Sequence, residues 1–122
     1  MILADTSVWI DHFRSKDIEL SALLEANEIL IHAFVIGEIA LGSLRQRQMI
    51  LENLGDLPRI DLANDEEVRY LIEREKLFSC GIGYVDAHIL TAARLAPDTL
   101  IWTRDKKLQN VAERLSLAAH QD

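Results

Sequence analysis

The stretch MILADTSVWIDHF, residues 1–13, decides how the rest of the chain is interpreted. Its apolar run, residues 1–4, stops at Asp5, and the polar Thr6 and Ser7 follow. A short, continuous apolar run that ends in polar residues is typical of a strand buried on both faces. In open parallel sheets, ligands bind beyond the carboxyl ends of such strands. The stretch therefore predicts a buried strand with a carboxylate at its functional end, followed by a helix that includes residues 8–13.

Asp5 also has a purely structural interpretation. Asp, Thr and Ser all cap helix N-termini, and Ser7 is the best candidate for the cap of the helix that follows. A cap needs no partner residues, whereas an acid that binds a metal does. The position alone leaves both roles open, so the other acids have to distinguish them.

The composition predicts one soluble domain. A chain of 122 residues with 49% hydrophobic and 27% charged residues suits a single globular domain, residues 1–122. No apolar run approaches the roughly 20 residues of a membrane span, and no basic segment precedes residues 1–4 as in a signal peptide. We expect a cytoplasmic protein without membrane contact. The single Cys80 has no partner for a disulfide or a metal site, so packing is its expected role.

Taken alone, the charge balance argues against a nucleic-acid partner. The chain has 13 basic and 20 acidic residues, which gives 13 − 20 = −7 with histidine neutral. Affinity for phosphate usually depends on a basic surface. A cation held by clustered acids reverses the charge locally, however, and a polyanion responds to local charge. The distribution of the acids therefore matters more than their number.

Short apolar runs alternate with helical patterns along the whole chain. This alternation predicts an α/β domain with a parallel sheet between helices. Asn64 and Glu67 have the spacing of a capping box, and Gly42 marks a break within the longest helical stretch. The expected extended segments are residues 1–4, 29–31, 59–62, 99–103 and 117–119. The expected helices cover residues 8–13, 17–27, 32–54, 64–78, 84–95 and 106–115.

Three further acids stand out from those on solvated helix faces. Glu38 lies among apolar residues early in a helix, and Asp86 lies in the first turn of the most apolar helix. Asp105 follows a strand closely, as Asp5 does. We expect these carboxylates to be buried, which costs several kcal/mol unless arginines, helix N-termini or a cation compensate the charge.

All four acids are expected at one edge of the sheet. Strand carboxyl ends and the first turns of the following helices share the same edge in a parallel α/β domain. Four carboxylates without a histidine or cysteine form an oxygen-only site, which suits Mg²⁺ or Mn²⁺. The pattern thus favours a metal site over a set of unrelated caps.

These motifs resemble those of the PIN-domain ribonucleases, in particular the VapC-type toxins of bacterial toxin-antitoxin modules. The resemblance rests on Asp5-Thr6-Ser7, on VIGEIALG around Glu38, on GIGYVDAHILTAARL around Asp86, and on Thr103-Arg104-Asp105. It implies a three-layer α/β/α, Rossmann-like fold with short, mainly parallel strands. It further implies an endoribonuclease that depends on Mg²⁺ or Mn²⁺, cleaves RNA with a metal-activated water, forms a homodimer and is neutralised by a small VapB-like antitoxin.

The resemblance also assigns roles to individual residues. Asp5, Glu38 and Asp86 match the core metal-binding acids, and Asp105 matches the fourth. Thr6 or Ser7 and Thr103 match the hydroxyl positions beside the first and last acids. The chain departs from many relatives where it enters the Glu38 helix, because His32 and Ala33 replace a Ser-Pro or similar pair.

Basic residues follow three of the acidic motifs and are candidate RNA contacts. A plain solvated surface role is the alternative for each of them. They are Arg14, Lys16, Arg45, Arg47, Arg104, Lys106 and Lys107. Trp9 and Trp102 lie in apolar runs, which favours core or interface positions over stacking on bases.

Other α/β families fit the acids less well. A response-regulator receiver needs a pair of early acids, and Asp5 has no acidic neighbour. A phosphatase of the haloacid dehalogenase type needs Asp-x-Asp at the first strand, but Ser7 holds the second acid's position. A non-catalytic PIN-like module that binds RNA or protein remains the main alternative.

Overall fold

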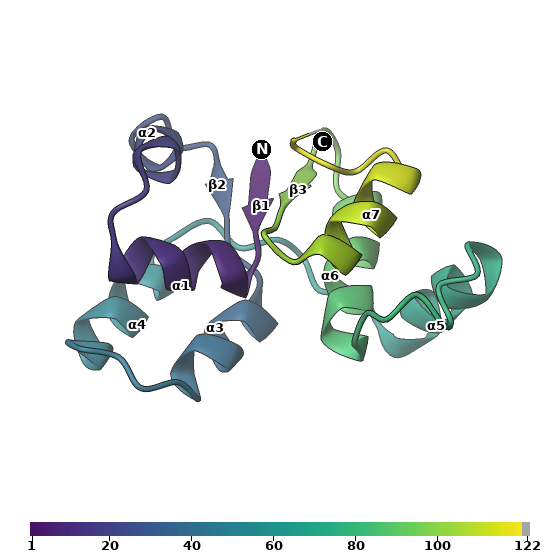
Figure 1. The fold of residues 1–122 in the computed structure, drawn as a ribbon, viewed down its shortest axis with the longest axis horizontal. Helices are drawn as coiled ribbons and strands as arrows, with labels where there is room; N and C mark the ends of the chain where they lie inside the picture. Colours follow the sequence, from purple (N-terminus) through teal and green to yellow (C-terminus); the bar gives the residue numbers. More distant parts are fainter. Residues whose placement is uncertain (121–122) are drawn as a thin grey trace.

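The centre of the molecule is a small parallel sheet. The computed structural model describes residues 1–120 and contains β1 (Ile2–Ala4), β2 (Ile29–Leu30) and β3 (Leu100–Trp102), ordered β2-β1-β3 (Figure 1). Ile2 pairs with Ile29 on one side of β1, and Leu3 pairs with Ile101 on the other. The carboxyl ends of β1 and β3 therefore point the same way, which brings Asp5 close to the segment that follows Trp102.

Helices flank this sheet in a three-layer α/β/α arrangement. In Figure 1, α1 to α4 lie on the β2 side of the sheet and α5 to α7 lie on the β3 side. Their bounds are α1 (Thr6–Arg14), α2 (Ile18–Glu25), α3 (Ala33–Ala40), α4 (Arg47–Gly55), α5 (Asp65–Arg74), α6 (Tyr84–Leu95) and α7 (Lys106–Arg114). The predicted alternation of short strands and helices, and the parallel sheet, are confirmed.

Two of the predicted extended segments form only single bridges. Ile31 bridges Arg59, and Ile101 bridges Ala118, both in parallel. The second contact has two backbone hydrogen bonds, from Ile101 N to Leu117 O at 2.7 Å and from Ala119 N to Ile101 O at 2.8 Å. Residues 59–62 and 117–119 thus extend the two sheet edges without forming regular strands.

The core surrounds the sheet and includes most of α6. Residues 87–93 of this helix are all buried, as expected for a helix segment that is apolar on every side, whereas Tyr84, Arg94 and Leu95 at its ends are exposed. The small Ala87, Ala92 and Ala93 allow neighbouring elements to approach closely. Trp9 and Trp102 are buried as well, as predicted for core residues.

The helix boundaries agree with the sequence patterns except at the end of α5. The break at Gly42 is confirmed, because α3 ends at Ala40 and α4 begins at Arg47. The Asn64–Glu67 capping box is present at the start of α5. The predicted continuation of this helix to Phe78 is wrong. Lys76 adopts φ +54°, and Leu77 N donates to Ile72 O at 2.9 Å, which closes the helix after Arg74.

No helix in residues 1–120 is long and apolar enough to cross a membrane.

Candidate active site

Asp5 lies at the junction of β1 and α1 and is the most enclosed of the four acids, with 6% of its surface exposed. Its Oδ1 accepts hydrogen bonds from Ser7 N at 3.0 Å and from Val8 N at 3.4 Å. Asp5 itself is therefore the N-cap of α1, and the prediction that Ser7 is the cap is wrong. Asp5 has the extended backbone that a cap requires, whereas Ser7 is already helical.

Two hydroxyl groups also bind the Asp5 carboxylate. Ser7 Oγ donates to Oδ1 at 2.5 Å, and Thr103 Oγ1 donates to Oδ2 at 2.5 Å. Burial raises the pKa of Asp5, while the hydrogen bonds from Ser7 and Thr103 lower it, and the net direction is upward. Capping and membership of an acidic site are thus compatible in one side chain.

Glu38 extends from the exposed side of α3, while the apolar Val35 and Ile39 of the same helix are buried. Its Oε1 accepts a hydrogen bond from Thr6 Oγ1 at 2.6 Å. This contact joins the first residue of α1 to α3 and turns the Glu38 carboxylate towards the Asp5 end of β1.

His32 caps the helix that carries Glu38. Its Nδ1 accepts a hydrogen bond from Phe34 N at 2.9 Å, so a neutral imidazole does here what a serine hydroxyl does at other helix starts. Burial and, to a smaller extent, the neighbouring His88 together lower the pKa of His32 to about 4. The unusual entry into α3 is therefore a capped one.

Asp86 lies in the first turn of α6, where its Oδ2 accepts a hydrogen bond from Gly83 N at 3.1 Å. Burial raises the pKa of Asp86, and the negative charges of Asp5, Asp105 and Glu38 raise it further. The charge of each of the other three acids thus affects the pKa of Asp86, so all four acids lie around one region of the molecule.

Asp105 caps α7 and belongs to the same region. Its Oδ1 accepts a hydrogen bond from Leu108 N at 2.9 Å, and its own N–H donates to Thr103 Oγ1 at 3.0 Å. Thr103 therefore contacts both Asp5 and the backbone of Asp105.

The expectation that all four acids are buried is wrong for Glu38 and Asp105, which are exposed, and Asp86 is half-buried. A helix that is apolar on its inner side still has an outer side, and Glu38 occupies that side of α3. The free-energy cost of burial therefore applies mainly to Asp5 and in part to Asp86, whose pKa is raised more by burial than by the other three acids.

The chemistry of the side chains suits a hard cation, although they are not already arranged in a coordination geometry. Every side chain offered is a carboxylate or hydroxyl, as Mg²⁺ and Mn²⁺ prefer. Within residues 1–120, no three acids, histidines or cysteines are close enough together to qualify as a ligand group. Each carboxylate is instead bound to a local donor: Thr103 and Ser7 for Asp5, Thr6 for Glu38, Gly83 for Asp86 and Leu108 for Asp105.

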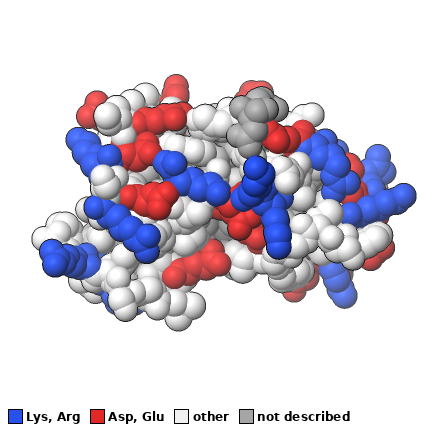
Figure 2. Space-filling view, viewed as in Figure 1, with Lys and Arg blue, Asp and Glu red and all other residues white. Residues whose placement is uncertain are grey.

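The surface around the acids has mixed charge. Figure 2 shows acidic side chains near the middle of this face and basic side chains on both sides of them. All seven candidate RNA contacts are exposed, and five of them are Arg14, Lys16, Arg45, Lys106 and Lys107. Lys107 lies over Gly81, whose φ of +81° and proximity to the lysine stem both disfavour a side chain.

The other two candidates, Arg47 and Arg104, contact the protein itself. Arg47 donates from Nε and Nη2 to Ala40 O at 3.2 and 2.9 Å, at the end of α3. Arg104 binds Asp11 and Asp17, two acids that sequence reasoning missed. The missed pairs join residues about 90 positions apart, and no local pattern in the sequence marks them.

A second unpredicted contact lies at the start of α6. Asp65 Oδ1 accepts a hydrogen bond from Tyr84 Oη at 3.0 Å and lies 3.3 Å from His88 Nε2. It joins the first residue of α5 to the helical turn that holds Asp86.

Comparison with known proteins identifies the family. The family model described as PIN domain matches residues 2–114, which is nearly the whole chain. The chain belongs to the PIN-domain family. It is also 39% identical over 122 residues to "Ribonuclease VapC32" from two strains of Mycobacterium tuberculosis, CDC 1551 / Oshkosh and ATCC 25618 / H37Rv. The match covers 100% of this chain and 98% of each relative.

The PIN-domain match includes all four acids and the hydroxyl residues beside them. The predicted resemblance to VapC-type PIN ribonucleases is therefore confirmed, together with the predicted fold class.

Proposed function

We propose that this PIN-domain protein is a metal-dependent endoribonuclease and the toxin of a toxin-antitoxin pair, acting in the cytoplasm as one domain of residues 1–122. The observation that best supports the proposal is the grouping of the four acids in one region, where Thr103 contacts both Asp5 and Asp105. The charges of Asp5, Glu38 and Asp105 also raise the pKa of Asp86. Mutual repulsion of this kind is destabilising unless a cation relieves it. The relatives named ribonucleases support the same reaction class.

The four acids have different proposed roles. Asp5 and Asp86 are the proposed direct ligands, and Glu38 is a ligand either directly or through water. Asp105 is proposed to hold a second ion or to orient the attacking water. Thr6, Ser7 and Thr103 orient the carboxylates through the hydrogen bonds described above.

The proposed cofactor is Mg²⁺ or Mn²⁺. When bound, the ion would lower the pKa of a water molecule and offset charge on the scissile phosphate. The contribution of the chain is to hold the acids in place through the hydrogen bonds of their carboxylates. The exposed Arg14, Lys16, Arg45, Lys106 and Lys107 are proposed to attract the RNA backbone towards them.

The test is cleavage of an RNA panel by the purified chain with and without Mn²⁺ or Mg²⁺. We expect cleavage only with metal, and a loss of at least about 100-fold in Asp5→Asn, because asparagine still caps α1 but carries no charge. Circular dichroism of the variant should match that of the unaltered protein. Undiminished cleavage by Asp5→Asn would contradict the assignment of the acids. RNA binding without any cleavage would favour the non-catalytic alternative.

The proposed antitoxin site is an apolar groove formed by the second half of α1, the start of α4 and the segment that joins α3 to α4. The groove has a volume of about 600 Å³ and is lined by Ile10, Phe13, Leu44 and Ile50, with Arg14 and Arg45 among the residues at its rim. This chemistry suits a VapB-like segment that combines apolar and acidic side chains. We expect Ile50→Glu to weaken inhibition by the antitoxin at least tenfold in a cleavage assay while cleavage by the free toxin is retained. Full inhibition of this variant would exclude the groove.

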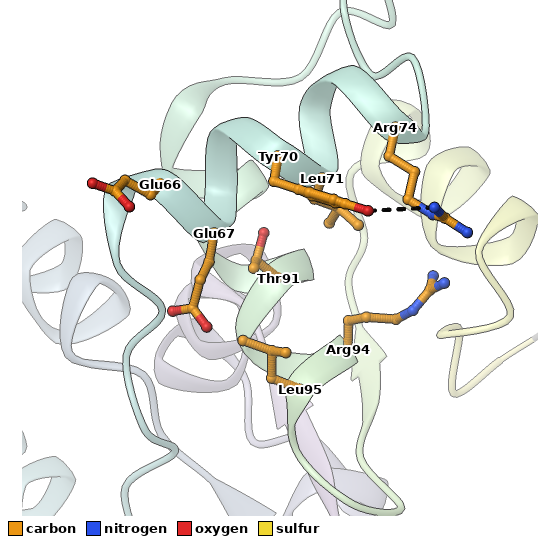
Figure 3. Close-up of a pocket in the computed structure, with 8 residues that line it drawn as sticks. All are labelled: Glu66, Glu67, Tyr70, Leu71, Arg74, Thr91, Arg94 and Leu95. Carbon is orange, nitrogen blue, oxygen red and sulfur yellow. Dashed lines mark hydrogen bonds between the residues drawn. The ribbon is translucent and has the colours of Figure 1, made fainter.

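The proposed homodimer contact is a second groove, between α5 and α6 (Figure 3). Its volume is about 480 Å³, and the exposed Tyr70 and Leu95 line it. Figure 3 shows Glu66 and Glu67 near one end and Arg74 and Arg94 near the other. A twofold axis across the groove pairs the acids of one copy with the bases of the second. Light scattering should report a dimer that Tyr70→Glu converts to a monomer; a Tyr70→Glu dimer would exclude this contact.

A further inference from the structure

Arg104 lies in the chain between Thr103 and Asp105 of the acidic site, but its side chain contacts acids outside that site. It follows Thr103 and precedes Asp105 in the turn between β3 and α7. Its Nε lies 3.0 Å from Asp11 Oδ2, and its Nη2 lies 2.6 Å from Asp17 Oδ2. The guanidinium also lies 5.7 Å from the ring centroid of Trp102. One side chain thus makes three contacts, two of them with carboxylates.

The two carboxylates belong to a different part of the chain. Asp11 lies on α1, and Asp17 is the N-cap of α2, where its Oδ1 accepts a hydrogen bond from Leu20 N at 2.8 Å. Asp17 therefore binds the start of α2 with one oxygen and Arg104 with the other. The guanidinium joins the α1–α2 connection to the turn between β3 and α7.

The backbone of the same turn is bound to the Asp5 side of the site. Arg104 N donates to Ser7 Oγ at 2.9 Å, and Ser7 Oγ donates to Asp5. On one side of Arg104, Thr103 donates to Asp5, and on the other side Asp105 N donates to Thr103. A shift of this turn would therefore disturb the hydrogen bonds of Asp5 and the position of Asp105 together.

We propose that Arg104 is a positioning residue: its ion pairs with Asp11 and Asp17 hold the turn of Thr103 and Asp105 in register with Asp5. This inference rests on the proposed nuclease function of the acids. It replaces the prediction that Arg104 is an RNA contact, because two carboxylates already neutralise its charge. A planar guanidinium binds two carboxylates from a fixed geometry, which a lysine ammonium does not reproduce.

The two roles of Arg104 predict opposite effects for Asp17→Asn. Asparagine keeps the cap of α2 but removes the charge that holds Arg104. If Arg104 positions the turn, this variant loses activity. If Arg104 contacts RNA, the same variant releases the guanidinium and removes a negative charge, so RNA binds more tightly and KM falls.

The experiment compares four variants with the full, unaltered chain: Arg104→Ala, Arg104→Lys, Asp17→Asn and Arg69→Ala. Arg69 is an exposed residue on α5 and controls for loss of one positive charge. We expect kcat to fall roughly 10- to 100-fold in the first three variants, as for residues that orient metal ligands, with KM changed less than threefold. The Mn²⁺ concentration for half-maximal activity should rise in the same variants.

A thermal-shift titration with Mn²⁺ gives a readout that is independent of cleavage. Loss of partly exposed ion pairs changes the melting temperature little, so a purely structural role predicts no change in the Mn²⁺ dependence of the shift. We expect Arg104→Ala and Asp17→Asn to need more Mn²⁺ than the unaltered chain and Arg69→Ala to need the same amount.

Either of two results would overturn the positioning role of Arg104 while leaving the nuclease proposal intact. One is an Asp17→Asn variant with lower KM and unchanged kcat, and the other is an Arg104→Lys variant with unaltered kcat and Mn²⁺ dependence. If the unaltered chain shows no cleavage with any RNA or metal, the nuclease proposal fails instead. The Mn²⁺ titration then still decides whether Arg104 orders the acids.

Discussion

At the scale of single residues, the acidic site depends on side chains that each have two roles. Asp5 caps α1 and binds Thr103, and Asp105 caps α7 and lies beside the same threonine. An N-cap interaction contributes about 1 kcal/mol, so it explains why an acid is tolerated at each position. It does not explain why three other acids raise the pKa of Asp86.

Thr103 offers a test of the hydrogen bonds around Asp5. We expect Thr103→Val to raise the pKa of Asp5 further, because the hydroxyl that lowers this pKa is lost. The carboxylate then ionises at higher pH, so the acidic limb of the pH–rate profile should move to higher pH while kcat falls roughly tenfold.

Thr99→Val is the matched control for this substitution. Thr99 is equally buried, but its hydroxyl donates to Pro97 O at 3.0 Å, beyond the opposite end of β3. An unchanged pH–rate profile in Thr103→Val, or an equal shift in both variants, would contradict the role of the Thr103 hydroxyl.

At the scale of elements, helix starts organise the site. Asp86 lies in the first turn of α6, Asp5 and Asp105 cap α1 and α7, and His32 caps the helix that holds Glu38. The positive ends of helix dipoles favour carboxylates there, although each contributes only about 0.3 to 1 kcal/mol. Parallel strands bring the helix starts to one edge, and this geometry places the acids together.

The cap of α3 predicts a pH dependence of stability. The pKa of His32 falls from 6.5 in the unfolded chain to about 4 in the folded one. The folded state therefore binds fewer protons than the unfolded state between these values. The contribution of His32 to the free energy of unfolding is complete above about pH 6.5 and is lost as the pH falls towards 4. Urea unfolding at pH 7.5 and 5 should show a loss of at most about 2 kcal/mol from this residue.

His32→Asn isolates this effect from the titration of the acids. Asparagine caps a helix without taking up a proton, so the variant should lose less stability than the unaltered chain between pH 7.5 and 5. Equal losses in both proteins would show that His32 does not titrate as described.

At the scale of the whole molecule, the clustered acids add local charge repulsion to a chain whose net charge is −7. Repulsion among Asp5, Glu38, Asp86 and Asp105 destabilises the folded state, and a cation that binds only this state stabilises it by mass action. We expect millimolar Mn²⁺ or Mg²⁺ to raise the melting temperature by several degrees. No shift at millimolar metal would contradict convergence of the acids on one ion.

Asp86→Asn separates repulsion from metal binding. The substitution removes the carboxylate that the other three acids repel, so the melting temperature without metal should rise. The further rise on adding metal should be smaller than in the unaltered chain. Glu73→Gln, an exposed acid on α5, serves as the control and should leave both unchanged. A full increment with metal in Asp86→Asn would exclude this side chain as a ligand.

The sequence by itself predicted the α/β class, the parallel sheet, most helix bounds and the four acids, because these depend on local patterns of apolar residues and caps. It did not predict the ion pairs of Arg104 with Asp11 and Asp17, or the contact of Thr103 with Asp5, which join residues from 87 to 98 positions apart. Only the tertiary structure decided which acids are buried, which residue caps α1, and which basic side chains are already bound. These properties depend on how strands and helices meet in space, and spacing along the chain does not determine that.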